Sequence, residues 1–237
     1  MTERSKAGSD AAIGDRQFYG RRKGHTLRPR QQERLAVRLP ELRLDLQGSP
    51  PTSLSALFPV PVNEFWLEVG FGGGEHLIHQ AVSNPGVGLL GAEPFVNGLS
   101  RMVQQLDEAG VKNARIHDDD ARFLLKWLPP ESISRAFILY PDPWPKRRHH
   151  RRRFVSAENL ALLARVMKPG ASLTVATDIP DYVRTTLIAI FSEGSFRWTA
   201  EVPEDWRKKN PDWPETRYEE KAKAAGRVSA YLVFERR

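Results

Sequence analysis

The sequence predicts an α/β protein with a doubly wound, mostly parallel sheet. The main observation is that short apolar runs alternate with segments of helical character from Phe65 to the end of the chain, as expected for parallel strands joined by right-handed crossover helices. A second observation is a glycine-rich turn, Gly70 to Gly74, directly after the first apolar run. With 40% hydrophobic residues, the 237-residue chain has enough apolar side chains for a proper core.

The alternation predicts seven strands and five connecting helices. We expect strands at residues 65–69, 88–93, 114–117, 136–140, 172–178, 196–200 and 229–236. We expect helices at residues 74–82, 96–109, 121–127, 157–167 and 182–191, the fourth closed by residues 168–170 (Lys-Pro-Gly). The connection between Ala200 and Arg227 is too long for a tight turn, and its two tryptophans and one tyrosine argue against disorder. An insertion of this length in a compact domain is usually functional.

The first 50 residues are expected to form a basic N-terminal arm, partly disordered, ahead of a main domain at residues 51–237. Residues 1 to about 15 are small and polar, a composition typical of disorder. The basic and aromatic segment from Phe18 to His25 is expected to become ordered on a partner. Gln31 to Leu46 predicts an amphipathic helix interrupted at Pro40, and the Pro/Ser-rich residues 47–61 predict a linker.

The positive charge is concentrated in two blocks. The chain has a net charge of +7 and a pI of about 9.8, yet Arg16 to Arg43 alone carries +7 and Lys146 to Arg153 carries +6. The remainder of the chain is therefore mildly acidic. Two dense basic blocks on such a body indicate a phosphate-backbone partner, while the simpler alternative is two solvated basic surfaces.

Composition excludes several classes of chemistry. The chain contains no cysteine, which rules out disulfides, thiolate nucleophiles and cysteine-ligated metal sites. It has no long apolar segment and no secretory signal, so we expect a cytoplasmic protein without a membrane partner. We expect no metal site either, because the adjacent His149 and His150 point apart and no set of ligands surrounds them.

The glycine-rich turn indicates a nucleoside ligand without phosphates. The dinucleotide fingerprint needs a glycine where Glu75 stands, and a glutamate at the start of a helix would repel a pyrophosphate. The G-x-G-x-G spacing of Gly70, Gly72 and Gly74 therefore suits a ligand such as S-adenosylmethionine. Glycine fits here because the turn demands unusual φ values and a close approach of the ligand to the backbone.

Acidic residues follow each of the first three strands. Glu93 is placed to accept the two ribose hydroxyls of a nucleoside. A carboxylate among Asp118–Asp120 could receive an adenine amino group, and Glu68 could meet the ammonium of a methionine moiety. Each carboxylate taken alone is as easily a solvated residue at a strand end, but all three together favour a site.

The fourth strand ends in a rigid acidic loop. Pro141 and Pro143 bracket Asp142 and keep it out of helical conformation, so its carboxylate is held at the mouth of the sheet beside the second basic block. Asp178 ends the fifth strand and is placed similarly. The alternatives are that Asp142 only forms a turn and that Trp144, which could stack on a flipped base, only packs the loop.

These motifs resemble those of the bacterial tRNA (guanine-N7)-methyltransferases, a family of class I S-adenosylmethionine-dependent enzymes. The resemblance extends over roughly residues 60 to 237, and its most specific part is the run from Pro141 to Lys146 (Pro-Asp-Pro-Trp-Pro-Lys). It implies a Rossmann-like, doubly wound, seven-stranded, mostly parallel sheet with an antiparallel last strand. It also implies methyl transfer from S-adenosylmethionine to guanine N7 in the variable loop of tRNA.

The resemblance, together with the motifs, predicts specific site residues. Cofactor contacts are expected from Glu68, Gly70, Gly72, Glu93, Asp120 and Asp142, the last being also the catalytic acid. Among the three aspartates, Asp120 is chosen because it immediately precedes Ala121. Substrate contacts are expected from Lys146, Arg151, Arg152, Arg153, Asp178, Thr216, Arg217, Tyr218 and Glu219.

The expected partner is tRNA, and the protein is expected to be a monomer or a weak homo-oligomer. Two other classes stay open at this point. A nicotinamide-dependent oxidoreductase would share the sheet but should have the third glycine of the fingerprint. A non-catalytic RNA-binding protein would share the basic blocks but has no use for a glycine turn with three acidic partners.

Overall fold

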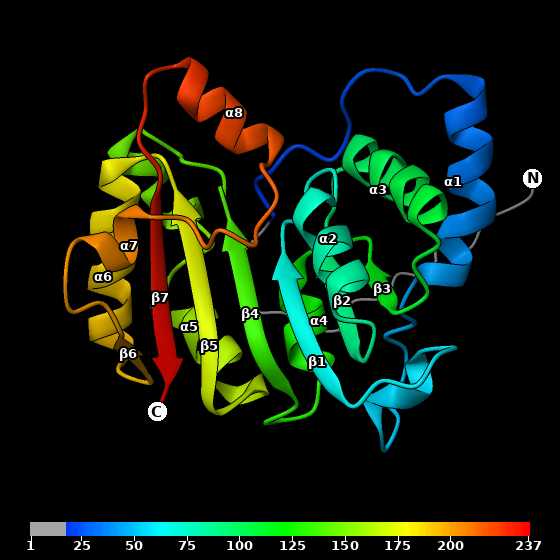
Figure 1. The fold of residues 1–237 in the computed structure, drawn as a ribbon, viewed down its shortest axis with the longest axis horizontal. Coiled ribbons are helices and arrows are strands. Elements are labelled where there is room, and N and C mark those ends of the chain that lie inside the picture. The colour runs from blue at the N-terminus through cyan, green and yellow to red at the C-terminus, as the bar shows by residue number, and fades with distance from the viewer. Residues whose placement is uncertain (1–17) are drawn as a thin grey trace, which may run out of the picture.

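A single sheet of seven strands has the order β3-β2-β1-β4-β5-β7-β6 in the computed structural model, which describes residues 18–237 (Figure 1). The strands are β1 (Glu64–Val69), β2 (Val87–Ala92), β3 (Ala114–His117), β4 (Ile133–Leu139), β5 (Met167–Thr177), β6 (Phe196–Trp198) and β7 (Ala230–Arg236). The neighbouring strands β3, β2, β1, β4 and β5 pair with one another in parallel, and β7 is antiparallel to both β5 and β6. The predicted fold class is confirmed.

The strand order reverses between β1 and β4, which are neighbours although two strands separate them in the chain. At such a switch point the connections on either side run in opposite directions and leave a crevice beyond the carboxyl ends of the strands. The topology therefore places a ligand site where β1, β2 and β4 end.

Helices cover both faces of the sheet (Figure 1). They are α1 (Pro29–Leu42), α2 (Glu75–Ser83), α3 (Val96–Ala109), α4 (Ala121–Trp127), α5 (Ala157–Val166), α6 (Pro180–Glu193), α7 (Glu204–Arg207) and α8 (Arg217–Ala224), with two 3₁₀ turns, η1 (Leu54–Leu57) and η2 (Arg147–Arg152). The helices predicted at 74–82, 96–109, 121–127, 157–167 and 182–191 correspond to α2 to α6. The long insertion before β7 contains α7 and α8, which the sequence reading did not predict.

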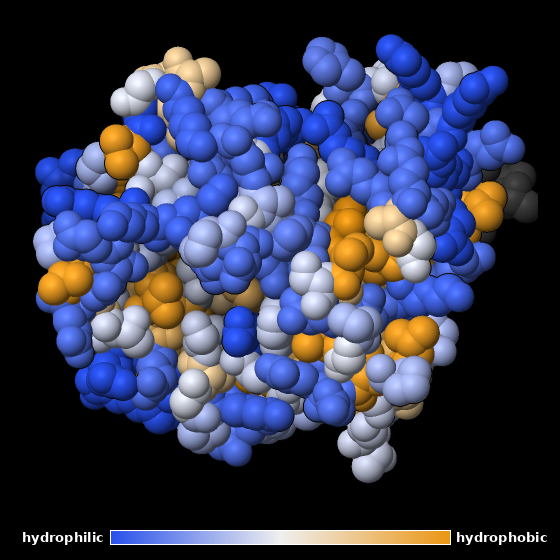
Figure 2. Space-filling model, viewed as in Figure 1, coloured by the Kyte–Doolittle hydropathy of each residue, from blue (hydrophilic) through white to orange (hydrophobic). Residues whose placement is uncertain are grey.

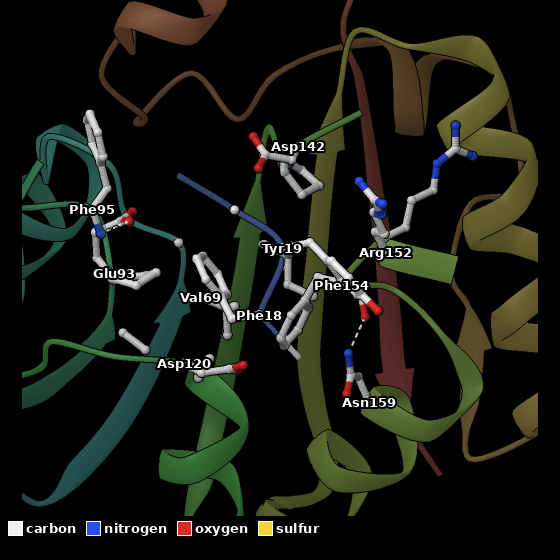
Figure 3. Close-up of a pocket in the computed structure, with 18 of the residues that line it drawn as sticks. Phe18, Tyr19, Val69, Glu93, Phe95, Asp120, Asp142, Arg152, Phe154 and Asn159 are labelled. Atoms are coloured by element: carbon white, nitrogen blue, oxygen red, sulfur yellow. Dashed lines mark hydrogen bonds between the residues drawn. The ribbon is translucent and has the colours of Figure 1, made fainter. Parts of the chain in front are cut away.

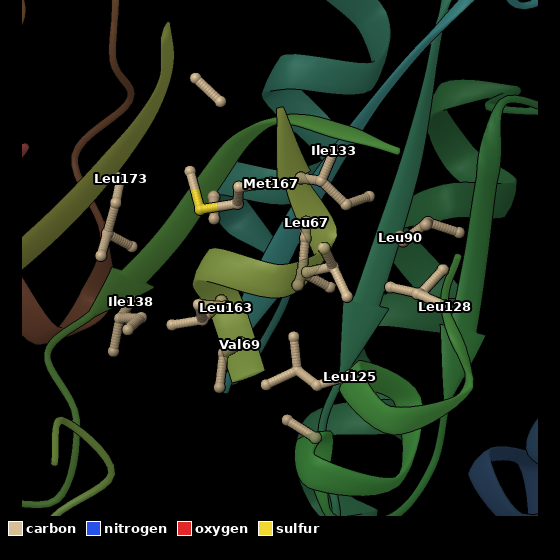
Figure 4. Close-up of a cluster of buried hydrophobic side chains, with 14 of the residues drawn as sticks. Leu67, Val69, Leu90, Leu125, Leu128, Ile133, Ile138, Leu163, Met167 and Leu173 are labelled. Atoms are coloured by element: carbon tan, nitrogen blue, oxygen red, sulfur yellow. The ribbon is translucent and has the colours of Figure 1, made fainter. Parts of the chain in front are cut away.

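Two apolar cores lie on opposite faces, because successive residues of each strand point to opposite sides. Leu90 of β2 belongs to the core that α4, α5 and α6 complete, whereas its neighbour Leu89 belongs to the core under α1, α2 and α3. Figure 4 shows the first core, in which Leu67 of β1 and Leu163 of α5 are fully buried. Burial on both faces explains why these strands are continuous apolar runs rather than alternating ones.

The N-terminal third of the described chain differs from the expectation. The helix predicted to 46 ends at Leu42, with Pro40 in its last turn, because Arg43 and Leu44 leave it to pair beside Ile116 at the edge of β3. The predicted linker is packed against the domain, since Leu54 and Phe58 are buried in the core. Its Pro/Ser-rich composition masked these two apolar anchors.

Two further details of the sheet differ from the prediction. Lys168 to Gly170 do not simply close α5 but form an irregular start of β5, where the pairing with β4 shifts register and Gly170 has a φ of +77°. β6 ends at Trp198, two residues early. Strand and helix boundaries are the part of a fold that sequence patterns specify least.

No helix in the described range is both long and apolar enough to cross a lipid bilayer. The face of the molecule in Figure 2 is mainly hydrophilic, and its apolar residues lie in separate small groups. Residues 1–15, expected to be disordered, lie outside the described residues.

Candidate active site

A cavity of about 330 Å³ opens at the carboxyl ends of β1, β2 and β4, where the topology places a ligand site. Figure 3 shows Glu93 and Phe95 on one side of it and Phe154 and Asn159 on the other. Its walls include eight of the predicted site residues, namely Gly70, Glu93, Asp120, Asp142, Arg151, Arg152, Arg153 and Tyr218. The predicted site residues that do not line the cavity are Glu68, Gly72, Lys146, Asp178, Thr216, Arg217 and Glu219.

The glycine turn has the backbone conformation that the sequence predicts. Gly70, Gly72 and Gly74 all have positive φ, at +72°, +57° and +87°, which other residues rarely adopt. The turn is also tightly enclosed, because a Cβ on Gly98 of α3 would lie 2.3 Å from the carbonyl oxygen of Gly72. A Cβ on Gly72 would lie 2.9 Å from the ring of Tyr218. A side chain at Gly72 or Gly74 would therefore collide with its neighbours, whereas Gly70 is required by its positive φ alone.

Glu93 fastens the glycine turn to the end of β2. Its carboxylate accepts hydrogen bonds from the backbone N–H of Gly72 at 2.7 Å and of Phe95 at 2.9 Å. Burial raises the pKa of Glu93 to about 7, against the lowering effect of these two bonds, and the negative charges of Asp142 and Glu68 raise it further. The carboxyl group is therefore poised to change its charge near neutral pH when a ligand supplies another donor.

The three consecutive aspartates after β3 have separate partners. Asp118 pairs with Arg43 and Asp119 with Arg22, both at 2.6 Å. Asp120 is the one that lines the cavity, as predicted from its place before Ala121. It also caps α4 by accepting the backbone N–H of Arg122 at 3.0 Å, and its carboxylate pairs with the guanidinium of Arg122.

Glu68, at the end of β1, is buried and faces α2. Its carboxylate lies 2.8 Å from Nδ1 of His76 in the first turn of that helix. It is close enough to Glu93 for its charge to raise the pKa of Glu93.

The Pro-Asp-Pro-Trp loop, residues 141–144, has a strained residue at each end, one just before it and one at its last position. Tyr140 and Trp144 have φ values of +51° and +42°, and non-glycine residues adopt such values only where the surrounding structure holds them. The hydroxyl of Tyr140 donates to Ser229 at 2.9 Å and lies 3.2 Å from the hydroxyl of Tyr231. The residue that precedes the loop is thus fixed to Tyr231 of β7 and to Ser229, just before that strand.

Asp142 lines the cavity, and much of its side chain is exposed to the solvent that fills it. The protein walls around the carboxyl group nevertheless exclude part of the bulk water, and this desolvation raises the pKa of Asp142. The positive charge of Arg21 acts in the opposite direction. The carboxylate is therefore exposed to the cavity but only partly solvated.

Arg153 is a correction to the expectation that three consecutive arginines contact substrate phosphate. It is 3% exposed, and its guanidinium donates to the carbonyl of Pro143 at 3.0 Å, to Thr185 at 2.7 Å and to the carboxylate of Asp181 at 2.8 Å. All of these partners belong to the protein itself. Arg153 fastens the Pro-Asp-Pro-Trp loop to α6 and is not available to a phosphate.

The other cations of this block differ in exposure. Lys146, Arg147, Arg148 and Arg151 are exposed on and around the η2 turn. Arg152 is partly buried, with its guanidinium 5.0 Å from the ring centre of Trp144 and 4.7 Å from that of Tyr19. Trp144 thus packs its ring on Arg152 within the loop.

The predicted substrate residues of the insertion lie at the start of α8. Thr216 caps this helix by accepting the backbone N–H of Glu219 at 3.2 Å, and the buried Glu219 carboxylate pairs with Lys209 at 3.0 Å. The ring of Tyr218 stacks on that of Tyr140, with centres 6.4 Å apart and planes 13° from parallel. Arg217 has its guanidinium over the Tyr218 ring.

Asp178, after β5, is paired with Arg227 at 2.6 Å. This ion pair joins the end of β5 to the stretch that leads from α8 into β7. Asp178 is therefore held at the carboxyl edge of the sheet, where the sequence placed it, although it does not line the cavity.

The sequence reading missed some residues of the cavity wall. The segment Phe18–Arg21 contributes to it, although its aromatic and basic character was interpreted as an arm for a partner. The segment is anchored next to the cavity, because Arg22 accepts a bond from the backbone of Val96 and Gly24 donates to Asn97. No sequence pattern indicates that this contact would be made within the chain.

Asn159 of α5 is another missed residue. Its side-chain N–H donates to the carbonyl of Phe154 at 2.7 Å, while its buried Oδ1 has no partner among the described residues. The described residues contain no group of three or more potential metal ligands.

Comparison with known proteins agrees with this geometry. A family model described as "Putative methyltransferase" matches residues 63–232. A tRNA (guanine-N(7)-)-methyltransferase of Ruegeria sp. (strain TM1040) is 56% identical over 227 residues, covering 93% of this chain and 88% of the relative. A protein of the same name from Agrobacterium fabrum (strain C58 / ATCC 33970) is 49% identical over 237 residues and matches along the whole of both chains.

Solved structures show the same fold at low sequence identity. The 16S rRNA methyltransferase KamB matches with a TM-score of 0.58 and 18% identity, over 81% of this chain and 96% of that one. An antibiotic-related methyltransferase matches with a TM-score of 0.53 and 16% identity, over 74% and 89% of the two chains. The family model spans most of the chain and its relatives are about half identical to it along nearly its whole length, so the chain belongs to the tRNA (guanine-N(7)-)-methyltransferase family.

Proposed function

We propose that this protein transfers a methyl group from S-adenosylmethionine to N7 of a guanine in tRNA. The observation that carries the proposal is the cavity at the switch point of the sheet, where the glycine turn, Glu93, Asp120 and Asp142 meet beside an exposed basic turn, in a chain of this family. That the guanine lies in the variable loop is a further part of the proposal and rests on the resemblance alone. Because the chain belongs to this family, the two alternatives left open by the sequence, a nicotinamide-dependent oxidoreductase and a non-catalytic RNA-binding protein, are set aside.

The residues around the cavity suit S-adenosylmethionine. The glycine turn leaves space where a side chain would block a close approach. The walls offer apolar surface from Val69, Phe95 and Ile138 for an adenine ring. The cofactor, when bound, supplies a methyl group on a positively charged sulfur.

The carboxylates of the site then have distinct roles. Glu93 accepts the ribose hydroxyls, Asp120 lies where the adenine amino group is expected, and Glu68 supplies the negative charge for the methionine ammonium. The negative charges of these carboxylates complement the two positively charged groups of the cofactor, its sulfonium and its ammonium.

Guanine N7 needs alignment more than proton transfer. It has a free lone pair and carries no proton, so methyl transfer at this atom requires no general base. The protein must hold N7 in line with the methyl carbon and the sulfur, which is catalysis by orientation. Asp142 is placed to accept hydrogen bonds from the guanine N1–H and amino group and to balance the positive charge that arrives on the purine.

The substrate side of the proposal combines three parts of the chain. Lys146 and the exposed arginines of η2 contact the phosphate backbone, while Asp178 and residues 216–219 approach the base. Tyr218, already stacked on Tyr140, is suited to pack against a purine ring. We further propose that the protein acts in the cytoplasm. Residues 1–50 are proposed as a basic arm that extends the basic surface of the domain at 51–237. The predicted oligomeric state remains a monomer or a weak homo-oligomer.

The direct test uses the purified protein with bulk tRNA and S-adenosylmethionine carrying a labelled methyl group. We expect label in tRNA, N7-methylguanosine among the digested nucleosides, and chain cleavage at that base under mild alkali within the variable loop. Label at any other atom would contradict the proposed reaction, and cleavage elsewhere in the tRNA would contradict only the position.

The pKa of Glu93 predicts a pH dependence of cofactor binding. Because burial raises this pKa to about 7 and ribose hydroxyls donate to the ionised form, the affinity for S-adenosylmethionine should increase as pH rises from about 6 to 8. Calorimetry in buffers of different ionisation enthalpy should show release of a proton on binding at pH 6. Glu93→Gln should bind more weakly, and its affinity should be flat over this range; an equally steep curve would show that another group titrates.

The carboxylate of Asp142 predicts a specific loss of the chemical step. Asp142→Asn keeps the size of the side chain but removes the charge that balances the cationic purine, so methyl transfer should fall by about 10² or more. The measurement is a single-turnover rate at saturating tRNA and S-adenosylmethionine, which separates chemistry from binding. A rate within about threefold of wild type, less than 1 kcal/mol of barrier, would make Asp142 a turn residue and move the role to Asp178.

The exposed arginines of η2 predict a salt-dependent binding of tRNA. When Arg147, Arg148 and Arg151 are all replaced by alanine, the slope of log K against log salt concentration should flatten by about 2 to 3, because each lost phosphate contact removes roughly 0.7 to 0.9. Because Arg151 also lines the cavity, cofactor affinity is measured separately.

The matched control removes exposed cations at the opposite edge of the sheet. Arg197 of β6 and Lys168 at the start of β5 lie at that edge. Replacing both with alanine should leave the slope unchanged. An equal effect of the two variants would mean that only net charge matters.

A further inference from the structure

Helix α2 carries two buried polar side chains, His76 and Gln80, for which nothing above gives a role. The partly buried Asn84 caps the end of the helix and continues the same spacing of four residues, so the three side chains lie on one side of it. Nδ1 of His76 lies 2.8 Å from the Glu68 carboxylate, and Nε2 of His76 lies 3.2 Å from Nε2 of Gln80. Oε1 of Gln80 accepts from the side-chain N–H of Asn84 at 3.3 Å.

These contacts select one protonation state of His76. The Gln80 amide group at Nε2 can only donate, so Nε2 of His76 must accept and carry no proton. The proton is then on Nδ1, where it is donated to the Glu68 carboxylate. With this tautomer, both ring nitrogens of His76 are satisfied by hydrogen bonds.

The ring of His76 makes a second connection. It packs edge-on against Trp213 of the insertion, with ring centres 4.8 Å apart, and against Phe137 of β4 at 4.7 Å. One turn further along α2, Nε2 of His79 bonds the carbonyl of Asp212 at 2.6 Å. The insertion is therefore seated on α2 three residues before Thr216, where the predicted substrate residues begin.

We propose that His76 is a positioning residue with two separable roles. Through Nδ1 it holds the Glu68 carboxylate in the orientation that receives the ammonium of the cofactor. Through its ring it seats Trp213 and so fixes where residues 216–219 meet the tRNA. The proposal rests on the proposed function, because it takes Glu68 as a cofactor contact.

Two substitutions separate the roles. His76→Phe keeps a ring for Trp213 but removes the donor to Glu68, whereas His76→Asn keeps an N–H at the position of Nδ1 but removes the ring. For His76→Phe, the Kd for S-adenosylmethionine should rise by about 10-fold or more, the scale of a lost hydrogen bond to a charged group, with KM for tRNA unchanged. For His76→Asn, KM for tRNA should rise several-fold while the cofactor Kd stays within about threefold.

Matched variants check the two paths. Trp213→Leu should reproduce the effect of His76→Asn on KM and leave cofactor affinity intact. Glu68→Gln should weaken cofactor binding, and adding His76→Phe to it should cause no further loss, because residues that act through one another are not additive.

Thermal unfolding of each variant reports whether it folds. If His76→Phe does not fold, Gln80→Met replaces it. This variant removes the amide that selects the tautomer of His76 but keeps the His76 ring and its Nδ1 donor. The cofactor Kd should then rise by a few-fold.

Three results would overturn the proposal. Equal losses of cofactor and tRNA affinity in both His76 variants would reduce the histidine to a packing residue. Unchanged cofactor affinity in His76→Phe, with a weakened Glu68→Gln, would show that Glu68 needs no support from His76. Unchanged affinity in Glu68→Gln would remove the cofactor role of Glu68 itself, and the proposed function would then stand without it if labelled methyl still reaches guanine N7.

Discussion

The structure of the site depends on one buried cation, Arg153. A guanidinium that is 3% exposed must have all of its charge and donors satisfied inside the protein. Its partners come from two places, the carbonyl of Pro143 in the acidic loop and Asp181 and Thr185 on α6, and its plane lies against the ring of Tyr182. The loop therefore cannot move away from α6 without leaving an N–H of a buried guanidinium without its acceptor.

The position of the loop determines several other features of the cavity. Asp142 precedes the fastened Pro143, and its carboxylate lines the cavity with no hydrogen-bond partner of its own among the described residues. Trp144 follows with a strained φ of +42° and supports Arg152, whose other face meets Tyr19. One fixed loop thus joins the proposed cofactor site, the proposed base site and the N-terminal segment.

Much of this arrangement could be predicted from the sequence. Apolar runs specify a parallel sheet because its strands are buried on both faces, and the carboxyl ends of parallel strands meet at one edge. That is why Glu93, Asp120 and Asp142, far apart in the chain, could be placed in one cavity. The burial of Arg153 could not be predicted, because the six cations among residues 146–153 look alike in the sequence, whereas the fold leaves most of them outward and buries Arg153 at the end of the η2 turn.

The central claim is that Arg153 fixes the acidic loop for catalysis, and Arg153→Lys tests it most directly. Lysine keeps the charge but cannot bond Pro143, Asp181 and Thr185 with one planar group. The measurement is the single-turnover rate of methyl transfer at saturating substrates, which should fall by about 10-fold or more because the carboxylate is misplaced, while S-adenosylmethionine affinity changes little. A variant that is less stable to heat yet transfers methyl at the wild-type rate would contradict the claim.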